Sequence, residues 1–317
     1  MSEPGWPASL EVRPATAADV EAMTAVFAAG ELAANGTVDV DADDVATDLK
    51  APLLASPDHA IVVADGVDVV ATGLLHAGHG GVWACVQPDH RGRGIGSALL
   101  AWTERTASAA GVAKARQSLS DSDTTAVALL SANGYSPMWT SWLLEYRMTD
   151  DPPAQPDPPE GIAIRPFAEP ADERMVYRLI QDAFGEWENH IPQTFEQWRA
   201  FGVDRGTFDA LLSPVAEDVE SGEVVGVALC LTYEEDEGYV HQLAVRADHR
   251  NRGIARALLL TAFGGFHDMG RRSVTLGTDS RTGALPMYER VGMLVRRSYT
   301  AYGKELGAEL RDDQPGG

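Results

Sequence analysis

Residues 240–260, VHQLAVRADHRNRGIARALLL, predict a short apolar strand, a polar turn and an Ala/Leu-rich helix. The turn contains Arg250, Asn251, Arg252 and Gly253. A strand that runs through such a turn into a helix points unpaired backbone N–H groups and the positive end of the helix dipole at one spot. Gly253 lets the backbone approach a phosphate without a Cβ in the way. This stretch therefore predicts a site for an anion such as a pyrophosphate.

The same arrangement occurs earlier, at residues 82–100, VWACVQPDHRGRGIGSALL, where the turn is residues 91–96, RGRGIG. The elements predicted around the two turns also recur in the same order. For the first half they are strand 10–14, helix 17–30, hairpin 60–75, strand 113–119, helix 124–132 and strand 142–148. For the second half they are strand 162–166, helix 173–184, hairpin 215–233, strand 273–276, helix 283–291 and strand 299–306. A repeat over nearly the whole chain predicts a duplicated α/β domain rather than one large fold.

The segment between the two halves is rich in proline and acid. It reads DDPPAQPDPPE at residues 150–160, a composition that cannot bury apolar surface and predicts a semi-rigid extended linker. We therefore expect an N-terminal domain at residues 1–149, a linker at 150–160 and a C-terminal domain at 161–317.

Composition limits the partners of the chain. A length of 317 residues is enough for two ordinary domains. The net charge of −22 argues against nonspecific binding to nucleic acid or to an anionic membrane surface, and it favours a cationic substrate such as an amine. The simpler interpretation, that the acids keep the protein soluble, is the more frequent one.

Three features predict a cytoplasmic protein. The first residues, MSEPGWPASLE, lack the pattern of a signal peptide, and no apolar run approaches the length of a membrane span. Cys85 and Cys230 each lie in an apolar strand-like run, which predicts buried thiols in a reducing compartment. We expect neither a disulfide nor a metal site.

The glycine-containing turns exclude two common nucleotide sites. A P-loop needs Lys-Ser/Thr after the glycines, and a dinucleotide fold needs Gly-x-Gly-x-x-Gly after the first strand. Both turns instead resemble the acyl-CoA loop of the GNAT acetyltransferases, Arg/Gln-x-x-Gly-x-Gly/Ala after a Leu-Ala-Val-like strand end. The resemblance implies an α/β (α+β mixed sheet) fold of two tandem GNAT-like domains, each with a mixed, mostly antiparallel sheet flanked by helices.

The same resemblance implies acetyl-CoA (CoA) as cofactor. In the second half it implies contacts from Leu243, Ala244, Val245, Arg250, Asn251, Arg252, Gly253, Ile254, Ala255 and Ser280. In the first half it implies contacts from Val86, Arg91, Gly92, Arg93, Gly94, Ile95 and Gly96.

Acetyl transfer from a thioester to an amine needs a base for the amine and an acid for the leaving thiolate. In GNAT proteins the acid is often a Tyr in a helix reading Ala-x-x-Leu-Tyr-x-x-x-Gly-Phe, and ALPMYERVGM at residues 284–293 resembles it, with Tyr288 as the acid. In the first half Leu130 stands at that place, and leucine cannot donate a proton. The family's base often lies on the strand before the loop, which implies His241 or Glu237; both remain open.

The tandem arrangement resembles the actinobacterial two-domain GNAT family that includes mycothiol synthase, in which an incomplete first copy precedes a complete second one. Substrate-side positions implied by this resemblance are Trp187, His190, Trp198 and Tyr239. A single aromatic residue in such a segment is more often part of a core.

We therefore expect an acetyl-CoA-dependent N-acetyltransferase of a small-molecule primary amine, monomeric or homodimeric, with its chemistry in the second half. The alternatives are a non-catalytic acyl-CoA-binding or regulatory module and a peptide or protein N-acetyltransferase.

Overall fold

The computed structural model describes residues 5–155, 157–187, 192–232 and 236–307. The chain forms two compact units, one of Met1–Ser141 with Arg297–Gly317 and one of Trp142–Arg296. Each unit has a mixed sheet flanked by helices, which confirms the predicted fold class. Within the described ranges, no helix has the length and apolar character that a membrane span requires.

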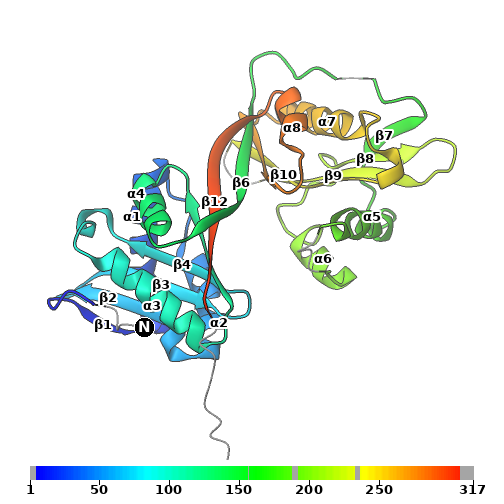
Figure 1. Ribbon diagram of the computed structural model, residues 1–317. Helices are drawn as coiled ribbons and strands as arrows, with labels where there is room; N and C mark the ends of the chain where they lie inside the picture. Colours follow the sequence, from blue (N-terminus) through cyan, green and yellow to red (C-terminus); the bar gives the residue numbers. More distant parts are fainter. Residues whose placement is uncertain (1–4, 156, 188–191, 233–235, 308–317) are drawn as a thin grey trace, which may run out of the picture. The chain divides into compact units, whose positions relative to one another are not determined.

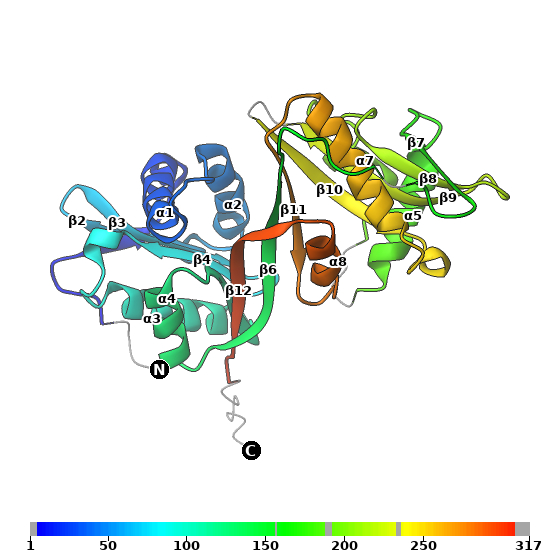
Figure 2. The same ribbon diagram turned by 90° about the horizontal axis from the view of Figure 1, so that it is seen from above.

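The sheet of the first unit has the strand order β1-β2-β3-β4-β5-β12-β6. Helices α1 and α2 cover one face and α3 and α4 the other (Figure 2). The elements are β1 (Glu11–Pro14), α1 (Val20–Asn35), α2 (Ala42–Ala55), β2 (Ala60–Asp65), β3 (Asp68–His76), β4 (Gly81–Val86), α3 (Ile95–Ala109), β5 (Lys114–Ser120), α4 (Thr124–Ala132), and parts of β6 (Ser136–Arg147) and β12 (Leu294–Glu305).

The sheet of the second unit has the order β6-β11-β10-β9-β8-β7. Helices α5 and α6 lie on one face, and α7 and α8 lie on the other (Figure 1). The elements are β7 (Ile162–Pro166), α5 (Glu173–Gly185), α6 (Phe195–Phe201), β8 (Pro214–Asp218), β9 (Val224–Thr232), β10 (Glu237–Val245), α7 (Ile254–Asp268), β11 (Ser273–Asp279) and α8 (Leu285–Arg290).

The boundary between the units differs from the expected one at residues 149–160. The chain passes from one unit to the other inside β6 and returns inside β12, and both strands begin five or more residues earlier than predicted, at Ser136 and Leu294. The later part of β12 pairs antiparallel with β5, from Tyr299↔Ser120 to Glu305↔Lys114. Local sequence pattern reveals that a strand exists, but it does not reveal in which sheet the strand pairs.

The proline-rich segment belongs to the second unit. The side-chain amide of Gln155 donates to the carbonyl oxygen of Leu260 in α7 at 2.9 Å, and Pro153 is buried. The expectation that this segment buries no apolar surface is therefore wrong. Its prolines suit an extended path along a helix, because such a path needs few backbone donors.

Each sheet contains one parallel strand pair that separates early. Among the described residues, β4 pairs with β5 at Gly81↔Arg116 and Val82↔Gln117, and β10 pairs with β11 from Glu237↔Ser273 to Tyr239↔Thr275. Beyond these pairs the strands diverge, and the polar turn and helix that follow β4 or β10 stand at the open end. This divergence creates the space that the candidate site uses.

The strand exchange generates a prediction for isolated fragments. A fragment of residues 1–149 lacks the β12 residues that pair with β5, so the edge of β5 is left unpaired and apolar side chains such as Leu130 lose their contact with Tyr302. We expect this fragment to show no cooperative thermal transition by circular dichroism. A fragment of residues 5–141 joined through a Gly/Ser linker to residues 297–307 restores the strand and should unfold cooperatively. Cooperative unfolding of the fragment of residues 1–149 would contradict the role given to β12.

Candidate active site

The two polar turns have the same backbone conformation. The residue that opens each turn has φ −67° and ψ 162°. The second and fourth positions are left-handed, with φ of 76° at Gly92, 82° at Gly94, 62° at Asn251 and 85° at Gly253. Asparagine is one of the few side chains that tolerate this region, so the second turn reaches the same shape with one glycine fewer.

Both turns end on a helix start that is open to an anion. Within the described chain no side chain caps α3 or α7 by a hydrogen bond, so the first-turn N–H groups remain available. A Cβ added at Gly94 would meet no described atom within 4 Å, and at Gly253 it would meet Pro159 Cγ at 4.0 Å. Both helix starts therefore fit a phosphate group.

The side chains of the second turn are largely engaged elsewhere. Arg250 forms a bidentate ion pair with Glu186, at 2.6 and 3.0 Å, and Arg252 donates to the carbonyl oxygen of Glu160 at 2.9 Å. Ile254, the first residue of α7, is 1% exposed and packs in the core, as does Ile95, the first residue of α3. The expected contacts from these positions are therefore restricted: the isoleucines can offer only backbone groups, and the arginines must first leave their present partners.

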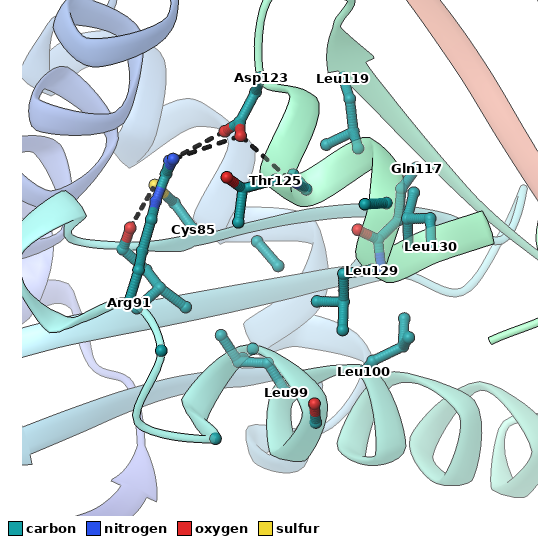
Figure 3. A pocket seen from close by; sticks show the side chains of 18 residues that line it. Cys85, Arg91, Leu99, Leu100, Gln117, Leu119, Asp123, Thr125, Leu129 and Leu130 are labelled. Atoms are coloured by element: carbon teal, nitrogen blue, oxygen red, sulfur yellow. Dashed lines mark hydrogen bonds and ion pairs between the residues drawn. The ribbon is translucent and has the colours of Figure 1, made fainter. Parts of the chain in front are cut away.

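In the first unit the gap between β4 and β5 holds a cavity of about 640 Å³ (Figure 3). Five of the seven expected cofactor positions line it, namely Val86, Arg91, Gly92, Gly94 and Gly96. Arg93 points instead to Asp65 at 2.8 Å and to His90 at 2.7 Å. The remaining lining includes five leucines of α3, β5 and α4, namely Leu99, Leu100, Leu119, Leu129 and Leu130.

Two polar features of this cavity were not anticipated from the sequence. Gln117 is 8% exposed and lines the cavity, and no described residue is recorded as a hydrogen-bond partner of its amide. Arg91 makes a bidentate ion pair with Asp123, at 2.8 and 3.2 Å, and Asp123 also accepts from the backbone N–H of Ala126 at the start of α4. The only sequence signal for this arrangement is the helix-capping pattern at Asp123.

In the second unit a β-bulge changes which side chains share a face of β10. The pairing with β9 shifts between Val240↔Cys230 and Gln242↔Leu229, so His241 is the extra residue. Val240 and Leu243 both pack on the α7 side, whereas the indole of Trp198 in α6 donates to Gln242 Oε1 at 3.0 Å. The bulge therefore puts both His241 and Gln242 on the side of α5 and α6. In the first unit, β3 and β4 pair from Ala71↔Val86 to His76↔Gly81 without such a shift.

His241 is half-buried and hydrogen-bonds to the backbone of Phe201. Burial lowers the pKa of this imidazole below its usual value, and the charge of Arg205 lowers it further. A histidine in this environment is neutral at neutral pH and can accept a proton.

Glu237, the other candidate base, lies at the start of β10 on the same face. Its Oε1 accepts a hydrogen bond from Thr275 at 2.9 Å, and its Oε2 is paired with Arg296 at 2.6 Å. Both carboxylate oxygens therefore already accept a hydrogen bond from another side chain. The geometry favours His241 over Glu237 as the proton acceptor.

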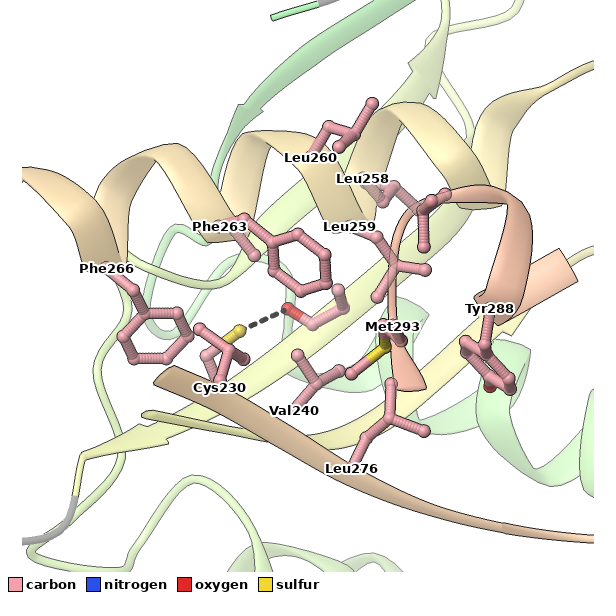
Figure 4. Packing of buried hydrophobic residues seen from close by; sticks show 14 of the residues in the cluster. Cys230, Val240, Leu258, Leu259, Leu260, Phe263, Phe266, Leu276, Tyr288 and Met293 are labelled. Carbon is pink, nitrogen blue, oxygen red and sulfur yellow. Dashed lines mark hydrogen bonds between the residues drawn. The ribbon is translucent and has the colours of Figure 1, made fainter. Parts of the chain in front are cut away.

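Tyr288 lies in the short helix α8 and is 7% exposed (Figure 4). It packs in the same cluster as Leu276 of β11 and Met293, on the α7 side of the sheet. Burial raises the pKa of its phenol to about 12, so the hydroxyl keeps its proton at neutral pH. Within the described residues no hydrogen-bond partner is recorded for this hydroxyl.

The expected substrate-side residues have different environments. Tyr239 is half-buried, and its ring centroid lies 6.3 Å from that of His241. Trp187 is 45% exposed and stacks on Phe184 at 4.5 Å. Trp198 is 1% exposed and belongs to the core, so the expectation that it contacts substrate is wrong; its large apolar surface supports the strand instead. His190 lies outside the described residues.

The remaining expected cofactor contacts divide between the faces. Leu243 and Val245 pack on the α7 side, whereas Ala244 is buried in the cluster with α5 and α6. Ser280 is exposed in the turn between β11 and α8. Alternation along the strand explains why Ala244 faces away from its two neighbours.

Comparison with known proteins finds a match in each unit to an acetyltransferase family model. A model of the acetyltransferase (GNAT) family matches residues 173–293, and a model of the acetyltransferase (GNAT) domain matches residues 56–137. The mycothiol acetyltransferase of Tsukamurella paurometabola is 28% identical over 71% of this chain and 78% of its own length. That of Mycolicibacterium vanbaalenii is also 28% identical, over 78% and 83%.

Solved structures agree with these matches. A GCN5-related N-acetyltransferase from Sphaerobacter thermophilus is 30% identical, with a TM-score of 0.76 over 95% of this chain and 96% of its own. A tandem GNAT protein from the clavulanic acid biosynthesis pathway has a TM-score of 0.66 at 18% identity, over 94% and 99%, and so shares the fold. Two family matches, one in each unit, and a full-length relative at 30% identity show that this chain is a tandem acyltransferase of the GCN5-related N-acetyltransferase (GNAT) family.

Proposed function

We propose that this protein is an acetyl-CoA-dependent N-acetyltransferase that acts on the primary amine of a small molecule, with its chemistry in the second unit. The observation that carries the proposal is the placement of two side chains around the gap between β10 and β11. His241 lies on the α5–α6 side of the sheet, and Tyr288 lies on the α7–α8 side. We place the thioester between these two side chains.

The proton states of these two groups suit the reaction. The neutral imidazole of His241 takes a proton from the substrate ammonium, directly or through a water molecule, and leaves a free amine. The amine attacks the thioester carbonyl, the C–N bond forms and the C–S bond breaks. Tyr288 then donates its phenolic proton to the departing thiolate, which leaves as CoA thiol, and the second proton of the ammonium leaves the new amide nitrogen and restores the phenol. Within the described residues the peptide groups of the bulged residue have no recorded partner in the ladder with β9, so they are available to polarise the carbonyl.

The proposed acceptor is a small amine because the similar proteins are named mycothiol acetyltransferases and because the net charge of −22 attracts a cation. A thiol-release assay with acetyl-CoA over a panel of amines, aminoglycosides and amino-sugar thiols tests the acceptor class. Turnover of peptide N-termini in preference to this panel would overturn the small-molecule assignment.

The first unit is proposed to bind acyl-CoA without catalysis. Leu130 stands where the phenol would be needed, and the positions that match the candidate bases are Gly80 and Val82. Nevertheless, the phosphate-binding turn is open, and the cavity contains Gln117, a buried amide that can bond to the amides of a pantetheine arm. A ligand held there would stabilise the folded unit.

Replacing the phenol tests the acid. Tyr288→Phe keeps the ring and its packing but removes the proton, so kcat should fall about a hundredfold with little change in the KM for acetyl-CoA. Steady-state kinetics at saturating amine measure this change, and an unchanged thermal unfolding temperature controls for folding. Wild-type turnover by Tyr288→Phe at every pH would show that Tyr288 is not the general acid.

The pH–rate profile tests the base. Because burial lowers the pKa of His241, activity should persist below the usual imidazole value of about 6.5 and decline only as more acidic pH protonates the ring. His241→Gln should lower kcat/KM and flatten this acidic limb. If Glu237 is the base instead, the limb survives in His241→Gln and disappears in Glu237→Gln.

A matched pair of glycine variants separates the two turns. Gly253→Asp puts a negative charge and a side chain at a left-handed position of the second turn, so it should weaken CoA binding there and abolish turnover. Gly94→Asp does the same in the first unit, so it should spare most turnover but remove the stabilisation of that unit by CoA. Calorimetry and thermal unfolding with CoA distinguish the two. Loss of activity in a folded Gly94→Asp variant would move the chemistry to the first unit.

A further inference from the structure

A histidine outside the expected site connects the phosphate-binding turn of the second unit to the hairpin of β8 and β9. His249 immediately precedes Arg250, ends a 3-10 turn at Ala247–His249 and is 8% exposed. Its Nδ1 lies 2.7 Å from Asp248 Oδ1, and its Nε2 lies 3.4 Å from Asp218 Oδ2 at the end of β8. Both ring nitrogens thus face a carboxylate.

Asp218 holds the hairpin turn at the same time. Its Oδ1 accepts from the backbone N–H groups of Glu220 and Ser221, at 3.1 and 2.9 Å, and from the Ser221 hydroxyl at 3.0 Å. These bonds, together with the one to His249, hold the pKa of Asp218 at about 2, so it stays charged in the neutral range. One carboxylate therefore joins the hairpin turn to the residue that precedes the phosphate-binding turn.

A second ion pair runs beside the first. Arg246, at the end of β10, pairs with Glu223 at 2.6 Å and with Asp248 at 2.7 Å, and its Nη2 lies 3.2 Å from His249 Nδ1. The pairing with Arg246 and the contact with His249 lower the pKa of Asp248 to about 2. The His249 imidazole therefore faces the carboxylates of Asp218 and Asp248, which stay charged in the neutral range, and the guanidinium of Arg246.

The first unit makes the same connection with a different side chain. There, Arg93 of the phosphate-binding turn pairs with Asp65 at the end of β2, and His90 contacts Arg93. In the second unit the matching arginine, Arg252, bonds to the carbonyl oxygen of Glu160, and the histidine reaches the strand-end aspartate itself.

We propose that His249 is a positioning residue for acyl-CoA binding, which holds the phosphate-binding turn of the second unit against the β8–β9 hairpin through Asp218. The inference rests on the proposed acyl-CoA site and adds the element that keeps this site in shape. This connection holds the turn, and with it the N–H groups at the start of α7, in the shape that a phosphate needs.

The test is calorimetry with CoA on the full chain carrying Gly94→Asp, so that the second unit supplies the measured site. His249→Gln should raise the Kd for CoA about tenfold, the loss of one hydrogen bond to a charged group. The kcat at saturating acetyl-CoA should stay unchanged while the KM rises. A histidine with a purely structural role would instead lower the thermal unfolding temperature and leave the Kd of the folded protein unchanged.

Three further variants complete the experiment. His90 is the residue of the first unit that corresponds to His249. His90→Gln should therefore leave the Kd of the second unit for CoA unchanged. Asp218→Asn should weaken CoA binding like His249→Gln, and the double variant should add little, because both remove one interaction. If His249→Gln does not fold, Glu223→Gln, whose side chain is 63% exposed, removes the neighbouring ion pair and should weaken CoA binding in the same direction.

The outcomes separate the positioning role from the site itself. A folded His249→Gln variant with the wild-type Kd for CoA, or with a lower kcat and an unchanged KM, overturns the positioning role. If Gly253→Asp still abolishes CoA binding in that case, the proposed acyl-CoA site stands. If Gly253→Asp also binds CoA normally, the site assignment itself fails.

Discussion

The early separation of one parallel strand pair in each sheet is the constraint on which the site depends. Parallel strands pair through evenly spaced, slanted bonds, and after two or three residue pairs these bonds end at Val82↔Gln117 and Tyr239↔Thr275. An opening in the middle of a sheet gives access to both of its faces, and the turn and helix that follow β4 or β10 place N–H donors at its wide end. Every candidate role, from phosphate binding to proton transfer, follows from this geometry.

The two units use this frame differently. Their turns share one backbone conformation, so both can bind an anion, but the chemistry beside the gap differs at two points. Leu130 replaces the phenol that Tyr288 supplies, and β10 has a bulge at His241 where β4 is regular. The first unit consequently keeps a leucine-lined cavity suited to binding, whereas the second has groups suited to proton transfer.

Burial shifts the pKa values of the two proposed catalytic groups in opposite directions, and each shift suits the role proposed for that group. Removing water disfavours whichever form is charged, so the pKa of the Tyr288 phenol rises and that of the His241 imidazole falls. Both groups are therefore neutral before the reaction, one as a proton donor and the other as a proton acceptor. Glu237 lies near the same gap, but Arg296 and Thr275 occupy its carboxylate.

The sequence by itself determined the repeat, the fold class and the position of the two polar turns. These depend on local pattern: glycines at left-handed positions, apolar alternation in strands and an Ala/Leu helix after each turn. It also singled out Tyr288 and the difference at Leu130, because residue type alone decides whether a proton can be donated.

Only the tertiary structure decided which sheet β6 and β12 join, because strand pairing is a long-range choice that local pattern does not encode. It also decided that Trp198 is core, that Gln117 faces a cavity and that His249 meets Asp218, since 31 residues of chain separate that pair. A one-residue bulge put Gln242 on the same face as His241, against the simple alternation of a strand. Side-chain roles of this kind depend on what approaches from distant elements, so they become visible only once the chain has folded.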